Sequence, residues 1–140
     1  NRRVASPFDI HRAWCLSREI PPEGLDRMRR ASACLIGRHD FSAFTAEGGK
    51  DMSHVRTLSR LTIEKDGDEY LFRVRADGFL YHMVRILVGT LVEVAFGRYC
   101  PEEMPDILSS CDRSRAGMTA PPDGLYLDSV FYEAGANDFL

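Results

Sequence analysis

Arg85 is the residue whose surroundings most need a chemical explanation, because it lies in a stretch that is otherwise almost wholly apolar. The stretch is FLYHMVRILVGTLVEVAFG, residues 79–97, and its periodicity predicts a helix. Arg85 points away from the main apolar face of this helix, toward the side of Gly89, where the missing side chain leaves room for the arginine stem. That apolar face consists of Leu80, Met83, Val84, Leu87, Leu91 and Val94.

A guanidinium in this position has two interpretations. In the first, its aliphatic stem crosses apolar surface and its charged end reaches water. In the second, its planar fork binds a carboxylate or a phosphate in a cleft. No acid on the same helix is well placed to pair with it, because Asp77 precedes the helix and Glu93 lies two turns further on. The residues alone leave both interpretations open.

The segment RHDFSAF, residues 38–44, holds the other candidate side chains. Asp40 has the carboxylate of a general base, although an aspartate in a turn commonly caps that turn instead. Phe41 and Phe44 have rings that could stack on unpaired RNA bases, or that could pin the loop to the core. These alternatives also stay open at this point.

Metal-binding and disulfide patterns are absent from the sequence. The four histidines and four cysteines are scattered, with no CxxC pair, so neither a metal site nor a disulfide framework is predicted. Unpaired cysteines are typical of a reducing cytoplasm, which is the expected location. Residues 79–97 approach the length of a membrane span, but the charges of Arg85 and Glu93 favour a core helix.

Charge is distributed unevenly along the chain. The 140 residues have a net charge of −3, which argues against strong free-standing binding of nucleic acid. Residues 1–75 nevertheless have a net charge of +3, and residues 76–140 have a net charge of −6. Arginine makes up 16 of the 18 basic residues, and its planar fork suits phosphates and carboxylates. A codon bias would produce the same excess.

Alternating strands and helices are predicted to position these residues. Strict alternation predicts a hairpin over 56–78, with its turn at 65–68 and with Tyr70, Phe72 and Val74 on one face of the returning strand. The other predicted elements are a strand at 11–20, a helix at 21–37, a long loop with at most one helical turn at 38–55, helices at 79–97 and 101–112, a loop at 114–124 and a strand at 125–132. This order predicts a single α+β domain over residues 1–140, with a ferredoxin-like antiparallel sheet and helices packed on one face.

Four blocks of the chain together resemble one enzyme family. They are GRHDFSAF (37–44), SHVRTL (53–58), GFLYHMVRILVGTLVEVAFGR (78–98) and APPDGLYLDSVFY (120–132). Their sequences, order and spacing are similar to the C-terminal half of TruA-type tRNA pseudouridine synthases, and the resemblance runs from about residue 7 to residue 132. His54 is a departure, because the family often has proline at this position.

The resemblance implies an isomerase that converts uridine to pseudouridine in the anticodon stem-loop of tRNA, without a cofactor. The family's catalytic aspartate and its tyrosine strand lie in the N-terminal half, and neither motif occurs here. The 140-residue chain alone is therefore expected to be inactive. By its match to the MVR motif, Arg85 is expected to be the cleft arginine that forms an ion pair with that aspartate.

The resemblance also implies substrate contacts and partners. Leu125 and Leu127 match the strand that floors the uridine pocket. Phe41 and Arg56 match blocks that lie along the cleft, where they would contact substrate or tRNA. The expected partners are tRNA, the N-terminal half of the same protein and a second subunit of a homodimer, with no membrane.

Because residues 76–140 are acidic, tRNA affinity is expected to come from residues 1–75, the N-terminal half of the protein and the partner subunit. Two further functions stay open on the sequence alone. One is a non-catalytic RNA-binding module with a ferredoxin-like sheet, and the other is a scaffold or dimerisation domain.

Overall fold

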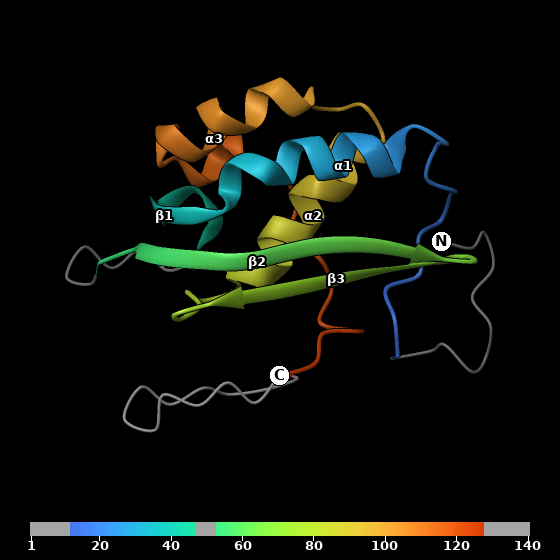
Figure 1. Ribbon diagram of the computed structural model, residues 1–140, viewed down its shortest axis with the longest axis horizontal. Coiled ribbons are helices and arrows are strands. Elements are labelled where there is room, and N and C mark those ends of the chain that lie inside the picture. Colours follow the sequence, from blue (N-terminus) through green and yellow to red (C-terminus); the bar gives the residue numbers. More distant parts are fainter. Residues whose placement is uncertain (1–11, 47–52, 128–140) are drawn as a thin grey trace.

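The chain folds around a three-stranded antiparallel sheet in the order β1-β2-β3, with helices packed against it (Figure 1). The computed structural model describes residues 12–46 and 53–127. The strands are β1 (Gly37–Asp40), β2 (Val55–Asp66) and β3 (Glu69–Ala76), and the α-helices are α1 (Gly24–Ser32), α2 (Met83–Ala95) and α3 (Met104–Ser110). Single turns of 3-10 helix lie at Ala33–Leu35, Ser42–Phe44, Pro101–Glu103 and Arg113–Arg115. The predicted α+β fold is confirmed.

The hairpin of β2 and β3 agrees with the pattern of the sequence. Its turn consists of Gly67 and Asp68, and Gly67 has φ +59°, a left-handed conformation that glycine adopts without strain. Tyr70, Phe72 and Val74 alternate along β3 and pack against the core, while the residues between them are exposed or half-buried on the other face. Strict alternation therefore predicted both the strand and its buried face correctly.

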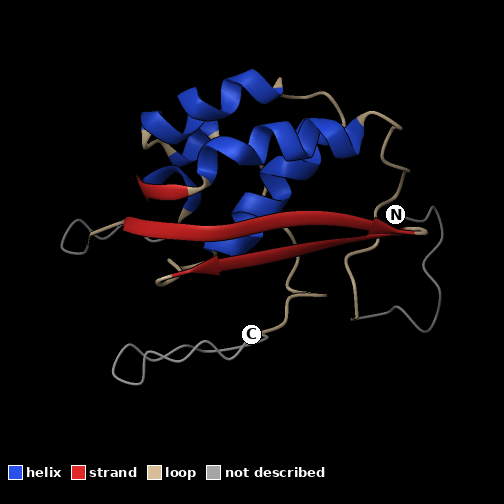
Figure 2. Cartoon of the chain, viewed as in Figure 1, coloured by secondary structure: helices blue, strands red, loops and turns tan. Residues whose placement is uncertain are grey.

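The helix predicted at residues 21–37 is shorter than expected. It is α1, which continues as one turn of 3-10 helix and ends at Leu35. Arg29 on α1 donates from Nε and Nη2 to the carbonyl oxygen of Ile63 on β2, at 3.0 and 2.7 Å, while Met28 is fully buried. These contacts fix α1 on the sheet, and Figure 2 shows α1 and α3 on the same side of the two long strands.

α2 runs through the middle of the core. Leu87, Leu91 and Val94 of the predicted apolar face are buried, and so are Ile86 and Thr90 on other sides of the helix. A helix that is covered on most sides is expected to be apolar on most sides, which explains the composition of this stretch. None of the helices in the described part of the chain is both long and apolar enough to cross a membrane.

Two segments of the chain differ from their predicted secondary structure. Residues 12–20 contain no strand, and the chain turns at residues 17 and 18 instead; residue 11 lies outside the described residues. The segment at 38–55, predicted as a long loop with at most one helical turn, contains such a turn at Ser42–Phe44, but it also contains most of β1, which was not predicted. β1 was missed because its residues show no apolar alternation, and its backbone is ordered by pairing with the start of β2 rather than by its own pattern.

The other predictions have mixed outcomes. The helix predicted at 101–112 corresponds to the 3-10 turn at Pro101–Glu103 followed by α3. Residues 125–127 of the predicted last strand do not form a strand, and residues 128–132 lie outside the described residues.

Candidate functional site

Arg85 is joined to the segment that follows α3 by two reciprocal hydrogen bonds. Its Nε donates to the carbonyl oxygen of Ala120 at 2.7 Å, and the backbone N–H of Ala120 donates to the carbonyl oxygen of Arg85 at 2.9 Å. The sequence had indicated no local partner for the guanidinium. The partner that the structure shows is a backbone carbonyl, which sequence patterns do not reveal.

Gly89 allows this segment to cross α2 at close range. A Cβ at Gly89 would lie 1.9 Å from the carbonyl oxygen of Met118. One residue on, the Thr90 hydroxyl accepts a hydrogen bond from the N–H of Gly117 at 2.9 Å and donates to the carbonyl of Ile86 at 2.7 Å. The space beside Gly89 is therefore filled by backbone, and the expectation that it accommodates the Arg85 stem is wrong.

We expect Gly89→Ala to destabilise the chain, although alanine is the better helix former by about 1 kcal/mol. The added methyl group would force the Met118 backbone away from α2, and overpacking of this kind costs about 1–3 kcal/mol. The expected fall in Tm is roughly 3–10 °C, measured by thermal unfolding followed by circular dichroism. An unchanged or higher Tm would mean that residues 117–120 do not rest on α2.

Arg113 holds the other end of the crossing segment. Its Nη1 donates to the carbonyl oxygen of Gly117 at 2.8 Å, and its Nη2 donates to the hydroxyl of Thr119 at 3.1 Å. Together with the contacts of Thr90 and Arg85, they secure residues 117–120 through five hydrogen bonds. The segment therefore fixes the backbone and Nε of Arg85 without occupying the ends of its guanidinium.

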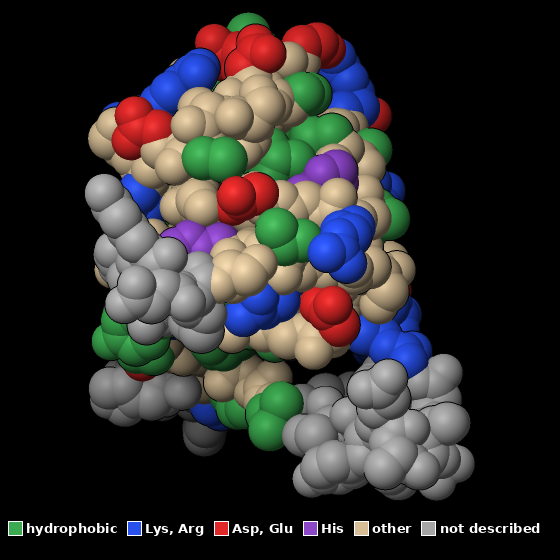
Figure 3. All heavy atoms as spheres, turned by 90° about the vertical axis from the view of Figure 1, so that its left-hand side faces the viewer, with side chains coloured by type: hydrophobic (Ala, Val, Ile, Leu, Met, Phe, Trp, Pro, Cys, Tyr) green, Lys and Arg blue, Asp and Glu red, His purple; other side chains and the backbone are tan. Residues whose placement is uncertain are grey.

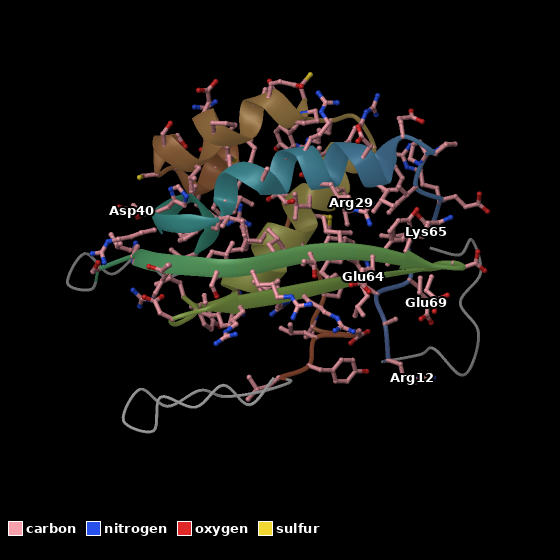
Figure 4. The ribbon with its side chains drawn as sticks, viewed as in Figure 1. Arg12, Arg29, Asp40, Glu64, Lys65 and Glu69 are labelled. Carbon is pink, nitrogen blue, oxygen red and sulfur yellow. The ribbon has the colours of Figure 1, made fainter. Side chains whose placement is uncertain are left out.

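A pocket of about 460 Å³ lies beside this arginine. It is bounded by β3, which is the edge strand of the described sheet, by the half-buried side of α2, and by the loop segments 12–16 and 120–126. The two loops contact each other, because the hydroxyl of Tyr126 donates to the carbonyl of Arg12 at 2.8 Å. Figure 4 shows Arg12 beyond β3, on the side of the sheet away from α1.

The walls of the pocket are mostly apolar. Val84, Val88 and Val92 come from α2, and Tyr70 and Phe72 come from β3. Arg85 is half-buried at this wall, together with the acids Asp66, Glu69 and Asp123 elsewhere on the lining. An arginine in an apolar pocket interacts strongly with any anion that reaches it, because the local dielectric is low.

The described residues leave the two terminal nitrogens of the Arg85 guanidinium available. Within residues 12–46 and 53–127, its side-chain contacts are limited to the Nε hydrogen bond, and no carboxylate forms a salt bridge with it. Nη1 and Nη2 are the pair that binds a carboxylate or a phosphate in the bidentate mode. The second interpretation of Arg85, a fork directed at an anion, therefore has the geometry that it needs.

The other predicted site residues are spread over the molecule. Leu125 lines the pocket with Arg85 and is 50% exposed, whereas Leu127 is more exposed and does not line it. Arg56 is half-buried near the start of β2, where its Nη1 donates to the carbonyl oxygens of Ser53 and Val55. The structure therefore brings only Arg85 and Leu125 of this set together.

Phe41 is fully buried and makes edge-to-face contacts with His39 and Phe44. Its ring belongs to the core and is not available to stack on a base in this conformation. Arg12 and Trp14, which line the pocket, were not identified from the sequence. They lie in the segment predicted as a strand, and nothing in that pattern indicated a site.

Asp40 has the contacts of a turn-capping residue. Its Oδ1 accepts from the backbone N–H of Ser42 at 2.9 Å and from the Ser42 hydroxyl, which also bonds His54 Nδ1 at 2.9 Å. Burial raises the pKa of the Cys111 thiol, and the nearby Asp40 carboxylate raises this pKa further. Asp40 does not line the pocket, and Figure 4 places it at the β1 end of the molecule.

A profile of the family described as tRNA pseudouridine synthase matches residues 31–133. The chain belongs to the tRNA pseudouridine synthase family. The resemblance read from the four sequence blocks is therefore confirmed. The matched residues include β1, the hairpin, α2 and the segment that crosses α2, so the pseudouridine synthase match contains both Arg85 and Leu125.

Curated relatives of this chain are nearly twice its length. The tRNA pseudouridine synthase A of Thermoanaerobacter sp. strain X514 is 46% identical over 132 residues, which cover 94% of this chain and 53% of the relative. The corresponding protein of Acetivibrio thermocellus is 43% identical over 94% of this chain and 53% of its own. The tRNA pseudouridine synthase A of Bartonella bacilliformis is 39% identical over 94% of this chain and 52% of its own length. The chain therefore spans about half the length of the relatives it matches.

Proposed function

We propose that this chain is the C-terminal part of an enzyme that isomerises uridine to pseudouridine in the anticodon stem-loop of tRNA. The observation that carries the proposal is Arg85, whose terminal nitrogens have no partner among the described residues and lie at the wall of an apolar pocket, in a chain about half as long as its synthase relatives. The N-terminal part would supply the catalytic aspartate that the sequence resemblance implies. The relatives named above do not favour the alternative of a non-catalytic RNA-binding module, since all of them are named as synthases.

The proposed role of Arg85 is to pair with that aspartate. A bidentate pair holds the carboxylate in one orientation and favours its ionised form, because a nearby positive charge lowers the pKa of an acid. The hydrogen bond from Nε to Ala120 and the crossing segment keep the guanidinium in place before the carboxylate arrives. Preorganisation of this kind avoids reorganisation during the reaction.

The remaining site residues have proposed roles at the substrate. Leu125 would contact the uracil ring from the pocket wall, with Leu127 further along the same segment. Arg56 would contact the tRNA backbone, since guanidinium groups bind phosphates well. Phe41 would act indirectly, because its buried ring packs against Phe44 of the 3-10 turn that follows β1. No cofactor is required in this scheme.

The partners follow from the same proposal. The N-terminal half of the protein would lie against the pocket at the edge of β3, and tRNA would lie along the resulting cleft. A homodimer that binds tRNA across both subunits, in the cytoplasm, is part of the proposal as the family resemblance implies it.

The test is a chimera in which this chain follows the N-terminal half of the Thermoanaerobacter relative. We expect the chimera to form pseudouridine in an anticodon stem-loop RNA, detected by mass spectrometry after nuclease digestion. The full-length relative is the positive control. A chimera that folds and binds the RNA without forming product would contradict the proposed function of this half.

We also expect the 140-residue chain alone to bind tRNA weakly and with strong salt dependence. With a net charge of −3, its affinity would come from a few phosphate contacts, each of which releases counterions. Fluorescence anisotropy at several salt concentrations measures this dependence. Tight binding at physiological salt would instead favour an RNA-binding module that is complete in itself.

A further inference from the structure

The loop between β3 and α2 exposes two aromatic rings that are two positions apart in the sequence. Phe79 is 44% exposed and Tyr81 is 58% exposed, while Leu80 between them is only 4% exposed and anchors the loop in the core. The loop lies at the end of the molecule where β2 begins and β3 ends, on the left of Figure 1. Figure 3 views that end and shows histidine, basic and acidic side chains on its surface.

The Tyr81 ring is held by its neighbour. It stacks on the imidazole of His82, with 3.8 Å between ring centroids and 22° between ring planes. His82 has φ +59°, a left-handed conformation that is unfavourable for a residue with a Cβ. Backbone strain of this kind persists only where the surroundings enforce it, and it is concentrated at functional sites.

Two further hydrogen bonds fix the loop in this conformation. The carbonyl oxygen of Tyr81 accepts from the N–H of Ala46 and from the hydroxyl of Thr45, both at 3.2 Å. Thr45 itself is buried. The Tyr81 ring is therefore presented in a defined orientation, with one face covered by His82 and more than half of the side chain open to solvent.

A fixed positive charge lies at the same loop. The side chain of Arg56 lies over Gly78, where a Cβ would come within 3.3 Å of Nε. Hydrogen bonds from Nη1 to two backbone carbonyls hold this guanidinium near the start of β2. Exposed aromatic rings beside an arginine are the combination that binds single-stranded nucleic acid, with bases stacked on the rings and phosphates near the charge.

We propose that Tyr81, stacked on His82, is a platform for an unpaired base of the RNA substrate, and that Arg56 contacts the phosphate backbone next to it. The proposal rests on the proposed function, which brings an RNA to this chain. Val84 and Arg85 line the pocket from the first turn of α2, directly after this loop. A base on Tyr81 would therefore belong to a nucleotide near the one that enters the pocket.

The test uses the 140-residue chain and a fluorescein-labelled single-stranded oligouridine RNA, with binding measured by anisotropy over a series of KCl concentrations. We expect Tyr81→Ala and Tyr81→Leu to weaken binding about ten-fold, because each removes the aromatic ring. Tyr81→Phe keeps the ring and should bind as the unchanged chain does. Ile36→Ala, at a similarly exposed apolar residue, is the matched control and should not alter binding.

Salt dependence separates stacking from charge. Tyr81→Ala should leave the slope of log K against log salt unchanged, whereas Arg56→Ala should reduce its magnitude by about one. Equal binding by Tyr81→Ala and the unchanged chain would overturn the platform, as would an absence of binding at the lowest salt. This binding test does not depend on catalysis. If the chimera were inactive but RNA binding still depended on Tyr81, the proposed function would be contradicted and the base platform would not.

Discussion

Pseudouridine formation by the 140-residue chain alone is expected to be undetectable, whereas the chimera with the N-terminal half of a relative is expected to be active. The reason is that the proposed reaction needs a carboxylate aligned with Arg85, and the described part of the chain places none in a salt bridge with it. The two proteins should be compared on the same anticodon stem-loop RNA, at equal concentrations and over long incubation. We expect all detectable product to come from the chimera and none from the chain alone.

Product from the chain alone would contradict this expectation and would identify a local acid as the catalyst. Asp123 lines the pocket and Asp40 is the last residue of β1, so Asp123→Asn and Asp40→Asn would separate the two. Asp106→Asn on the exposed side of α3 is a control, since that carboxylate does not line the pocket. Loss of product in only one of these variants would identify the substituted aspartate as the catalytic acid.

The elements with a clear hydrophobic period were the ones that the sequence predicted well. The β2–β3 hairpin alternates with period two and contains a glycine at its turn, so local chemistry determines both its strands and its connection. The helix around residues 79–97 was identified for the same reason, although α2 starts only at Met83. Its late start follows from His82, whose left-handed backbone no residue pattern had indicated.

The elements that depend on distant partners were the ones that the sequence missed. β1 is polar and has only the residues Gly37–Asp40, and its hydrogen bonds come from β2 across a separation of more than a dozen residues. Residues 12–20 alternate loosely, but within the described structure no strand pairs with them. A strand is stable through its neighbours, so an isolated pattern is a weak guide to it.

The candidate site was predicted in part. An arginine inside an apolar helix and a glycine four residues later both indicated that something unusual lies on that side of α2. The sequence could not show that the backbone of residues 117–120 fills the space, because this contact depends on how the chain returns after α3. The reciprocal bonds between Arg85 and Ala120 therefore came only from the structure.

Those bonds change what Arg85→Ala should do to the stability of the chain alone. On the sequence, with no local partner expected, Arg85→Ala should leave the Tm unchanged or raise it slightly. The structure shows a hydrogen bond from a charged donor to the Ala120 carbonyl, and such bonds contribute about 1.5–3 kcal/mol. The side chain is only half-buried and water can replace the donor. We therefore expect Arg85→Ala to lower the free energy of unfolding by an amount near the lower end of that range, with a correspondingly small decrease in Tm.

In the active chimera, Arg85→Ala should have a much larger effect on turnover than on folding. Removing one member of a buried charge pair costs about 3–5 kcal/mol, because the other charge is left without a partner. If this cost falls on the reacting carboxylate, turnover should fall by about two to four decades, since each 1.36 kcal/mol is ten-fold in rate. Single-turnover assays with saturating enzyme measure this chemical step without interference from product release.

Arg85→Lys distinguishes the proposed pairing from a purely structural role. Lysine keeps the positive charge but loses the planar fork, so it should restore only part of the lost turnover while restoring little of the Ala120 hydrogen bond. Arg113→Lys is a matched control, because Arg113 supports the crossing segment and does not line the pocket. Near-normal turnover in Arg85→Ala, combined with a large loss of stability in the chain alone, would show that the arginine holds residues 117–120 and does not act on a carboxylate.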